Sequence, residues 1–481
     1  MRENVVKFFD KGMFGYKMLY FVLVLLSFNS LCARTTGLNY LTYIVAFLGA
    51  VFLVFRLFRW KNYIDTRGII FLVLFCGSYA LSSLLMRQYG LMENIQAMIW
   101  MVIQFFVVYT YDKSRDVSED KREIKIISWF FIGYTFVLAA AGLIMFVMGY
   151  YHYRPVVDNA VITGFLWNRL WGLYSDPNYG AVFSIISCVM AGFFFKTAKK
   201  GLRVFLVIHA VLQIAYIALS DSRTGLVAAA VTAAAAMFLL ALRFRRLKQM
   251  KTVLKGVVSL LLAVILAVGS VGIVLGVQKG GNAFKVWQRE IQTQNGEDDK
   301  EKEEEEILVG RTEADINNDI SNRRFAIWYS GYEIFKTSPL FGISFRYYRE
   351  YAKDNLPNTY IVNNDFGEFG SMHNAFVDVF VSQGLLGCVI LLCFIISVLT
   401  ALFRRLFKSE DKDYKYRVFL LLCIIPVFVS MMFYSETFYM NTGGAFLFWA
   451  FLGYLMHSLT QDTKSKFHFK KNRGKPCVKS A

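Results

Sequence analysis

The chain has 481 residues, of which 56% are hydrophobic and only 18% are charged. A soluble protein would carry charges on about a quarter of its residues, so the composition excludes an ordinary soluble enzyme. The net charge of +18 fits either nucleic-acid binding or the basic loops that orient a membrane protein.

Twelve apolar blocks are long enough to cross a bilayer, because a hydrocarbon layer of about 30 Å needs roughly 20 residues of helix. The sequence therefore predicts an all-α polytopic membrane protein with about 12 transmembrane helices. The blocks lie near residues 18–33, 38–57, 68–86, 95–111, 126–149, 178–195, 203–219, 224–242, 254–277, 385–403, 417–434 and 443–459.

The basic residues fall mainly on one side of this predicted bundle. Both ends of the chain and every second connection hold most of the 53 Lys and Arg residues. The short connections on the other side hold only Arg34, Arg87, Arg154, Arg169 and Arg223. Basic connections stay in the cytoplasm, so we expect cytoplasmic N- and C-termini. The positive charge then needs no nucleic-acid partner.

The predicted spans divide the chain into four parts. Helices one to nine occupy residues 1–277, a long extracytoplasmic loop occupies 278–373, a loop-exit helix and the last three spans occupy 374–459, and a basic cytoplasmic tail occupies 460–481. Within the loop, residues 297–306 read EDDKEKEEEE. Such an acidic run cannot bury enough apolar surface to fold, so we expect a mobile insertion there.

The later part of the loop has the pattern of amphipathic helices. From Arg323 the sequence RRFAIWYSGYEIF places apolar and aromatic residues at helical spacing. The following KTSPLFG, at 336–342, ends this helix with proline and glycine. The loop therefore carries amphipathic helices on the outer surface.

The first candidate binding residues precede the span at 178–195, in the sequence NRLWGLYSDPN. Ser175 or Asp176, followed by proline, is a common helix start. A helix N-terminus is also a site for anions. Arg169 is the candidate ligand in this segment, and Asn178 is a possible supporting residue.

A second candidate lies in the short outer link SDSRTG at residues 220–225. Arg223 has a simple alternative role, in which its side chain reaches the membrane interface. However, Asp221 and three hydroxyl residues surround it in sequence and can fix its guanidinium by hydrogen bonds. A fixed guanidinium with five donors suits a phosphate or diphosphate.

Two further candidates flank the end of the loop. Arg323 and Arg324 begin the amphipathic helix, where a solvated face is the alternative reading. His373 and Asn374 lie in GSMHN at the outer membrane boundary. A histidine is neutral near pH 7 and can act as a general base, although a single histidine is often structural.

Together the outer arginines and one histidine describe a site for a diphosphate. No sequence spacing typical of a metal site occurs, and neither a phosphate-binding P-loop nor a G-x-S-x-G motif is present. Arginines would therefore have to neutralise the charge. We expect no metal and no cofactor.

Four segments, in this order, resemble the O-antigen ligase and O-antigen polymerase family of bacterial membrane glycosyltransferases. They fall within roughly residues 165–400 and read RLWGLYSDPNYG, SRTG, RRFAIWYSGYEIFKTSPLFGIS and HNAFVDVFVSQGLLG. The resemblance implies a helical C-type glycosyltransferase-like fold. It also implies a metal-independent, inverting reaction at the outer face of the bacterial cytoplasmic (inner) membrane, with a glycan on undecaprenyl diphosphate as donor.

The resemblance also assigns roles to residues. Arg223 and Arg324 look like diphosphate ligands, and His373 looks like the group that activates the acceptor hydroxyl. Arg169 matches an arginine of the first motif with a less defined role. The neighbouring Arg323 leaves open which arginine of that pair faces the site.

Several functions remain open at this point. A polymerase adds one lipid-linked repeat to another, whereas a ligase moves the finished glycan to lipid A core or to a protein. We favour a polymerase because residues 345–360 contain five Tyr or Phe residues that could grip a sugar chain. A flippase and a chain-length regulator of the same pathway are expected partners, besides the lipid bilayer. The alternative from another class is a transporter or lipid-linked glycan flippase.

Overall fold

A computed structural model describes residues 2–156, 159–244, 247–294, 309, 323–364, 369–408 and 411–472. Each predicted apolar block overlaps a helix. The corresponding elements are α1 (Arg2–Ser27), α2 (Thr36–Phe58), α4 (Ile69–Leu85), α5 (Leu91–Ile103) with the π-helix η1 (Gln104–Tyr109), α6 (Val117–Met148), α7 (Pro177–Phe195), α8 (Lys200–Leu219), α9 (Arg223–Ala241), α10 (Thr252–Gln294), α14 (Ala375–Arg405), α15 (Asp411–Ser430) and α16 (Gly443–Asn472).

Within the described residues, eight helices are long and apolar enough to cross a membrane: α2, α5 with η1, α6, α7, α8, α9, α10 and α14. A shorter apolar helix, α4, accompanies them. The chain is therefore a helical, multi-pass membrane protein. The count of twelve spans stays a prediction.

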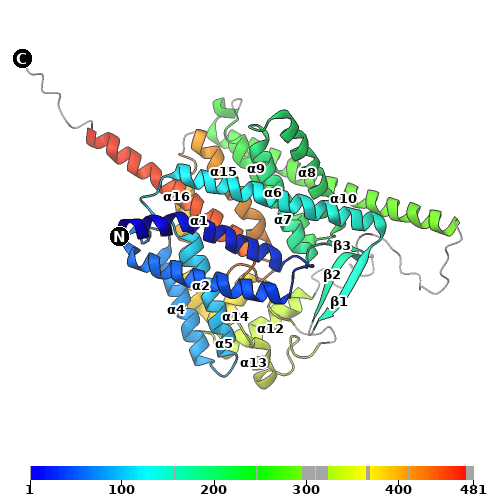
Figure 1. Cartoon of the computed structure of the whole chain (residues 1–481), viewed down its shortest axis with the longest axis horizontal. Helices are drawn as coiled ribbons and strands as arrows, with labels where there is room; N and C mark the ends of the chain where they lie inside the picture. Colours follow the sequence, from blue (N-terminus) through cyan, green and yellow to red (C-terminus); the bar gives the residue numbers. More distant parts are fainter. Residues whose placement is uncertain are drawn as a thin grey trace, which may run out of the picture.

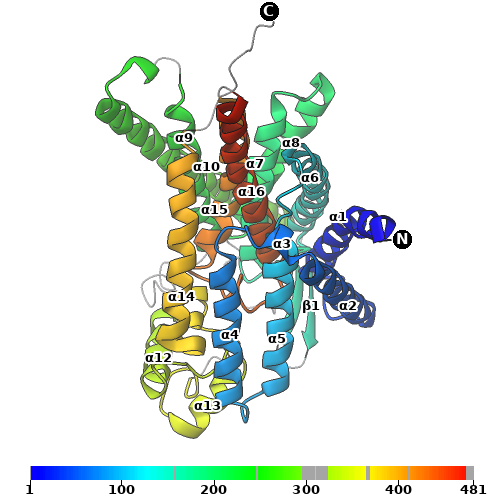
Figure 2. The same cartoon turned by 90° about the vertical axis from the view of Figure 1, so that its left-hand side faces the viewer.

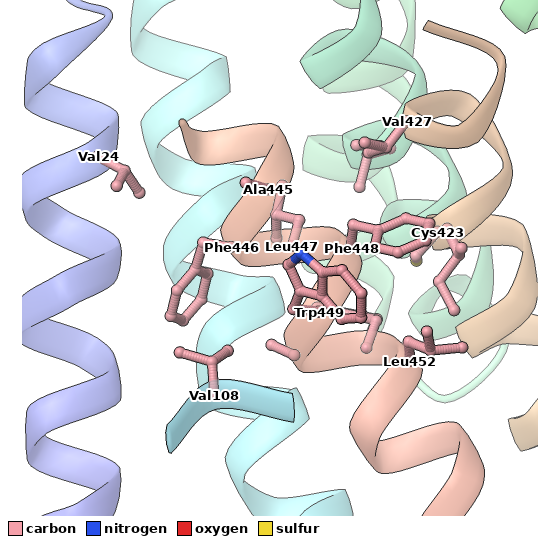
Figure 3. Close-up of a cluster of buried hydrophobic side chains, with 14 of the residues drawn as sticks. Val24, Val108, Cys423, Val427, Ala445, Phe446, Leu447, Phe448, Trp449 and Leu452 are labelled. Atoms are coloured by element: carbon pink, nitrogen blue, oxygen red, sulfur yellow. The ribbon is translucent and has the colours of Figure 1, made fainter. Parts of the chain in front are cut away.

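Helix α16 lies in the core of the bundle. All of residues 445–449 are buried, which is expected of a helix that is apolar on every face. Figure 3 shows these side chains together with Val24 of α1 and Val108 of η1. The indole of Trp449 donates a hydrogen bond of 2.8 Å to the carbonyl oxygen of Thr437, which ties the core to the connection between α15 and α16.

A small antiparallel sheet interrupts the helices between α6 and α7. It has the order β1 (Tyr151–Val156), β2 (Asn159–Leu166) and β3 (Arg169–Gly172), and Figure 1 shows it on the far side of the bundle from both chain termini. The sequence analysis expected only a connection here, because a search for membrane spans does not detect strands of four to eight residues. Apart from this sheet, the regular structure of the described residues is helical, as predicted.

The helix α14 contains a break at Gly384, whose φ of 59° lies in the left-handed region that glycine adopts readily. The segment 339–344 fills the break. The amide of Ile343 donates to the carbonyl of Val381 (3.0 Å), and the amide of Leu385 donates to that of Pro339 (2.9 Å). The break lies between residues 375–383 and the predicted span at 385–403, and the division into a loop-exit helix and a span stays a prediction.

Several boundaries differ from those predicted. Helix α10 continues to Gln294, so the first part of the loop predicted at 278–373 is helical, and Figure 1 shows this end projecting from the bundle. Helix α16 continues to Asn472, into the predicted tail. The expected insertion at 297–306 lies outside the described residues.

The remaining helices of the described chain are short. They are α3 (Trp60–Tyr63), η2 (Leu247–Gln249), α12 (Arg324–Thr337) and α13 (Tyr348–Asn355). Helix α12 covers the segment that the sequence predicts as an amphipathic helix, and α13 is a second helix of the loop. Figure 2 shows them at the opposite end of the molecule from the C-terminus.

Candidate functional site

The start of α7 is held by a carboxylate and an amide. Asp176 is the N-cap, as predicted, with proline in the next position. Its Oδ1 accepts hydrogen bonds from the backbone amide of Asn178 (2.7 Å) and from the side-chain amide of the same residue (3.0 Å). The carbonyl oxygen of this side chain is thereby turned toward the α8–α9 turn.

Arg169 of β3 stabilises that turn by hydrogen bonds. Its Nη2 donates to Oδ1 of Asn178 (3.1 Å) and its Nε donates to the carbonyl of Ser220 (2.9 Å). The hydroxyl of Ser222 donates to the same Asn178 oxygen (2.8 Å). The two described bonds of Arg169 join three segments of protein, and its predicted role as a diphosphate ligand stays a prediction. Both Arg169 and Asn178 therefore contact the α8–α9 turn.

Arg223 is the first residue of α9 and lies in the turn that Arg169 and Asn178 hold. Ser222 caps this helix by accepting a hydrogen bond of 2.9 Å from the amide of Gly225. Asp221 has a left-handed backbone (φ 45°) and accepts a hydrogen bond of 3.1 Å from Gln278 of α10. The neighbours of Arg223 therefore fix the turn, and Arg223 is partly buried. Their expected hydrogen bonds to its guanidinium stay a prediction.

The two arginines at the start of α12 differ in position. Arg323 is the N-cap and has a left-handed backbone with φ 69°. Arg324 is the first helical residue, and its Cζ lies 5.4 Å from the ring centroid of Phe433 and 6.0 Å from that of Tyr434. These distances are typical of cation–π contacts. Arg324 therefore faces the loop between α15 and α16.

His373 lies next to the same loop. Its ring is edge-on to Phe369 (6.0 Å between centroids) and to Tyr434 (6.3 Å). Burial, and then the charge of Arg324, lower the pKa of His373 to about 4, while Asp176 acts in the opposite direction. The imidazole is therefore neutral at pH 7, and the arginine of α12 and the cap of α7 both lie within its electrostatic reach.

The turn that carries His373 is fixed by its neighbours. Asn374 caps α14 by accepting hydrogen bonds from two backbone amides of the first turn. The buried Asp378 accepts a hydrogen bond of 2.9 Å from the amide of Met372 with one oxygen, and a hydrogen bond from the hydroxyl of Ser435 with the other. Asp378 thus connects the residue before His373 to the loop that carries Tyr434.

Tyr434 is the residue that the sequence analysis missed. Its ring contacts His373 and Arg324, and its centroid is 5.2 Å from that of Tyr179 near the start of α7. The prediction placed Tyr434 at the end of a span. The sequence does contain a signal for a polar loop here, because SET at 435–437 separates two apolar blocks. Glu436 of this loop is fully buried.

The described contacts thus bring together the starts of α7, α12 and α14 and the loop at 431–442. Of the predicted residues, His373 and Arg324 meet around Tyr434. Arg169 and Asn178 contact the turn that contains Arg223. Asn178 also bonds to Asp176, and the ring of the next residue, Tyr179, contacts that of Tyr434.

Residues 208–392 match the model of a family described as O-antigen ligase. The matched segment contains Arg223, Arg324 and His373, whereas Arg169 and Tyr434 lie outside it. The match agrees with the family resemblance of the sequence motifs. No curated protein matches the chain.

Proposed function

We propose that this chain, a membrane enzyme of the O-antigen ligase and polymerase type by its segment 208–392, transfers a glycan from a lipid diphosphate to a sugar hydroxyl. The observation that supports this most directly is the neutral His373 beside Arg324 and Tyr434, at the meeting point of three helix starts. A neutral base and a cation are the two groups that such a transfer needs.

In the proposed reaction, His373 takes the proton of the acceptor hydroxyl as that oxygen attacks the anomeric carbon of the donor glycan. The bond between this carbon and the diphosphate oxygen breaks, and undecaprenyl diphosphate leaves with the bonding electrons. Attack opposite the leaving group inverts the anomeric carbon. General-base assistance of this kind is worth about 10²- to 10⁴-fold in rate.

Arg324 and Arg223 would stabilise the negative charge that grows on the diphosphate. A donor placed where charge develops contributes about 3 kcal/mol to lowering the barrier. Because arginines supply the counter-charge, the proposed reaction is metal-independent. Arg169 and Asn178 contribute by holding the turn from which Arg223 begins α9.

The aromatic residues of 345–360 were the reason to favour a polymerase. Phe345, Tyr348 and Tyr351 are buried, whereas Tyr347 is 43% exposed and Tyr360 is partly buried. Two accessible rings are a small part of the surface that a glycan acceptor would need.

Helix α12 offers such a surface. Phe325, Tyr329 and Tyr332 are 67%, 61% and 48% exposed, and their spacing of four and three residues places them along one face of the helix. This face follows directly from Arg324. We propose that it holds the acceptor glycan, and that the enzyme is a polymerase acting on lipid-linked repeats at the outer face of the membrane.

The second candidate function is a ligase, which the description of the matched family favours. The two reactions leave different products in a cell that lacks the gene. Loss of a polymerase leaves single repeats on the lipid diphosphate. Loss of a ligase leaves full-length polymer that stays on the lipid diphosphate.

The test is therefore deletion of the gene, followed by complementation with the wild type, His373→Asn or His152→Asn. His152 is an exposed histidine of β1 and serves as the matched control. We expect the wild type and His152→Asn to restore a polymer ladder, and His373→Asn to leave single repeats at equal membrane level. Long polymer that stays on the lipid diphosphate in the deletion strain would show that the enzyme acts as a ligase and not as a polymerase. A normal glycan in that strain would contradict both.

A further inference from the structure

A second polar cavity lies away from the candidate site, beside the last turns of α14. Figure 2 shows these turns toward the end of the molecule opposite α12 and α13, on the side that the basic connections predict as cytoplasmic. The cavity has a volume of about 150 Å³ and is lined by residues just before α4, at the end of α14 and on α16. None of its described lining residues belongs to the candidate site.

The charged side chains in the described lining are mostly arginines. They are Arg67 before α4, Arg404 and Arg405 at the end of α14, and a single carboxylate, Asp65. The Oδ2 of Asp65 is 2.8 Å from the ammonium of Lys113, which is not part of the lining. Because Asp65 is paired with this separate cation, the arginines give the cavity a positive charge.

Arg67 and Arg404 keep donors that a ligand can use. Arg67 donates from Nε to the carbonyl oxygen of Ser397 (3.0 Å), whereas its Nη1 and Nη2 have no hydrogen-bond partner among the described residues and are not buried. Arg404 is exposed and makes no hydrogen bond or ion pair within the described chain. A planar guanidinium with unused donors suits the oxygens of a phosphate group.

Exposed apolar side chains lie near the cavity on two adjacent helices, since α4 packs against α14. Ile70 in the first turn of α4 is 58% exposed, and Ile396 of α14 is 53% exposed. Ile396, Thr400 and Arg404 follow one another at four-residue spacing and so share a face of α14, and the last two line the cavity. In a membrane such apolar side chains contact acyl chains, so a lipid fits this place better than a soluble phosphate does.

We propose that the cavity binds the headgroup phosphate of an anionic phospholipid, with Arg67 and Arg404 as its ligands and the acyl chains along α4 and α14. Basic pockets between the cytoplasmic ends of transmembrane helices bind such headgroups. The proposal does not depend on the transfer reaction at His373. The alternative is that these arginines only orient the chain in the membrane, in which case no saturable lipid site exists.

The first measurement is the binding of phosphatidylglycerol and of phosphatidylcholine to the purified full-length chain in detergent, followed by native mass spectrometry. We expect saturable binding of phosphatidylglycerol that is tighter than that of phosphatidylcholine, because the choline cation cancels the charge of the phosphate. Arg67→Gln and Arg404→Gln should each weaken it about fivefold, the effect typical of one basic residue at an anionic membrane surface. Arg404→Gln decides the outcome if Arg67→Gln does not fold, because Arg404 has no bond in the described chain to lose.

Arg122→Gln is the matched control, because Arg122 is an exposed arginine near the start of α6, on the same predicted side of the membrane. It should bind phosphatidylglycerol as the wild type does. Equal binding of the two lipids, or equal weakening in Arg122→Gln and Arg404→Gln, would show that surface charge in general attracts the lipid, and would overturn the proposal.

The second measurement separates a lipid from a soluble phosphate. Glycerophosphoglycerol has the headgroup of phosphatidylglycerol without the acyl chains, and we expect it not to displace the bound lipid at equal concentration. Phosphatidylglycerol should also raise the melting temperature of the wild type and of Arg122→Gln more than that of Arg404→Gln, because a ligand that binds only the folded chain stabilises it. Displacement by the soluble headgroup, or an equal rise in all three proteins, overturns the proposal.

Discussion

Two histidines, one at each end of the bundle, have contrasting surroundings: His457 is buried and His373 is partly buried. His457 of α16 is 1% exposed, its Nδ1 is 2.6 Å from Asp120, and its ring stacks on Tyr111 at 4.7 Å. The ring of His373 makes only edge contacts with Phe369 and Tyr434, and it has no hydrogen bond among the described residues. A histidine ring that is both hydrogen-bonded and stacked has a structural role. The ring of His373, with no hydrogen bond among the described residues, can bind a substrate.

The arginines of the two ends differ in the same way. Arg115 forms ion pairs with two glutamates. Arg324 contacts aromatic rings, and no carboxylate of the described chain lies within 4.0 Å of it. Such an arginine beside a neutral histidine suits the proposed transfer of a glycan from a diphosphate.

The largest expected effect separates the two histidines. His373→Asn should lower the transfer rate by about 10²- to 10⁴-fold with little change in melting temperature, because asparagine also tolerates the left-handed backbone at 373 (φ 50°). His457→Phe should lower the melting temperature, because a buried acceptor without its partner costs about 1–3 kcal/mol. The transfer rate per folded molecule should be retained.

Both quantities are measured on purified protein, the rate with a synthetic lipid-diphosphate-linked repeat and the stability by thermal unfolding. If His373→Asn destabilises the protein and leaves the rate unchanged, the two histidines have the same structural role. The contrast between the two ends would then be wrong.

Some features of this contrast were predictable from local sequence. The helices follow from long apolar blocks, the cap at Asp176 from the sequence SDPN, and the break of α14 from its glycine. Each of these depends on a few consecutive residues, whose hydropathy or backbone preference determines the structure directly.

Other features depend on contacts between distant segments. Arg169 bonds to Ser220, which is 51 residues away, so this contact could not be predicted from the motif that contains Arg169. Tyr434 lies beside Arg324 and His373 only because the loop at 431–442 folds back against the start of α14, where the amide of Ala375 bonds to Met431 (2.8 Å). Pattern and spacing do not encode such contacts.

The next largest effect tests the geometry of the arginines. Arg324→Lys should lower the rate about a hundredfold, because an ammonium cannot replace a planar guanidinium that binds two oxygens. Arg223→Lys should be nearly as damaging as Arg223→Ala for the same reason. Arg323→Lys is the matched control, because Arg323 precedes the helix and should tolerate the change.

The transfer assay with the lipid-linked substrate measures all four variants, each at equal folded concentration. A fully active Arg324→Lys would argue against a diphosphate clamp at the start of α12. Loss of activity only in Arg323→Lys would move the role to the neighbouring residue.

A smaller effect is expected from the carboxylate that positions the His373 turn. Asp378→Ala removes the acceptor for the amide of Met372 and for the hydroxyl of Ser435, so the turn and the loop are no longer joined. We expect the transfer rate to fall roughly tenfold, about 1.4 kcal/mol in the barrier, mainly in kcat. Ser435→Ala should have a weaker effect of the same kind.

Asp413→Ala is the control for these two variants, because its carboxylate is 38% exposed and, among the described residues, its one ion pair is a distance of 3.5 Å to Lys121. The readout is the split between kcat and KM. An increase in KM alone after Asp378→Ala would place the carboxylate in substrate binding, and an unchanged kcat would remove its positioning role.

The smallest effect is a change in the pKa of His373. The charge of Arg324 lowers this pKa and that of Asp176 raises it, so Arg324→Gln should raise the pKa and Asp176→Asn should lower it further, without loss of the α7 cap.

The pKa of His373 in the folded protein, about 4, lies below the ordinary histidine value of 6.5. Protonation of His373 therefore favours unfolding, and its contribution to stability is lost as the pH falls from about 6.5 toward 4. NMR titration of the labelled histidine ring measures both shifts. If neither variant moves the titration, Arg324 and Asp176 do not lie within electrostatic reach of His373, and the site is not assembled as the contacts around Tyr434 indicate.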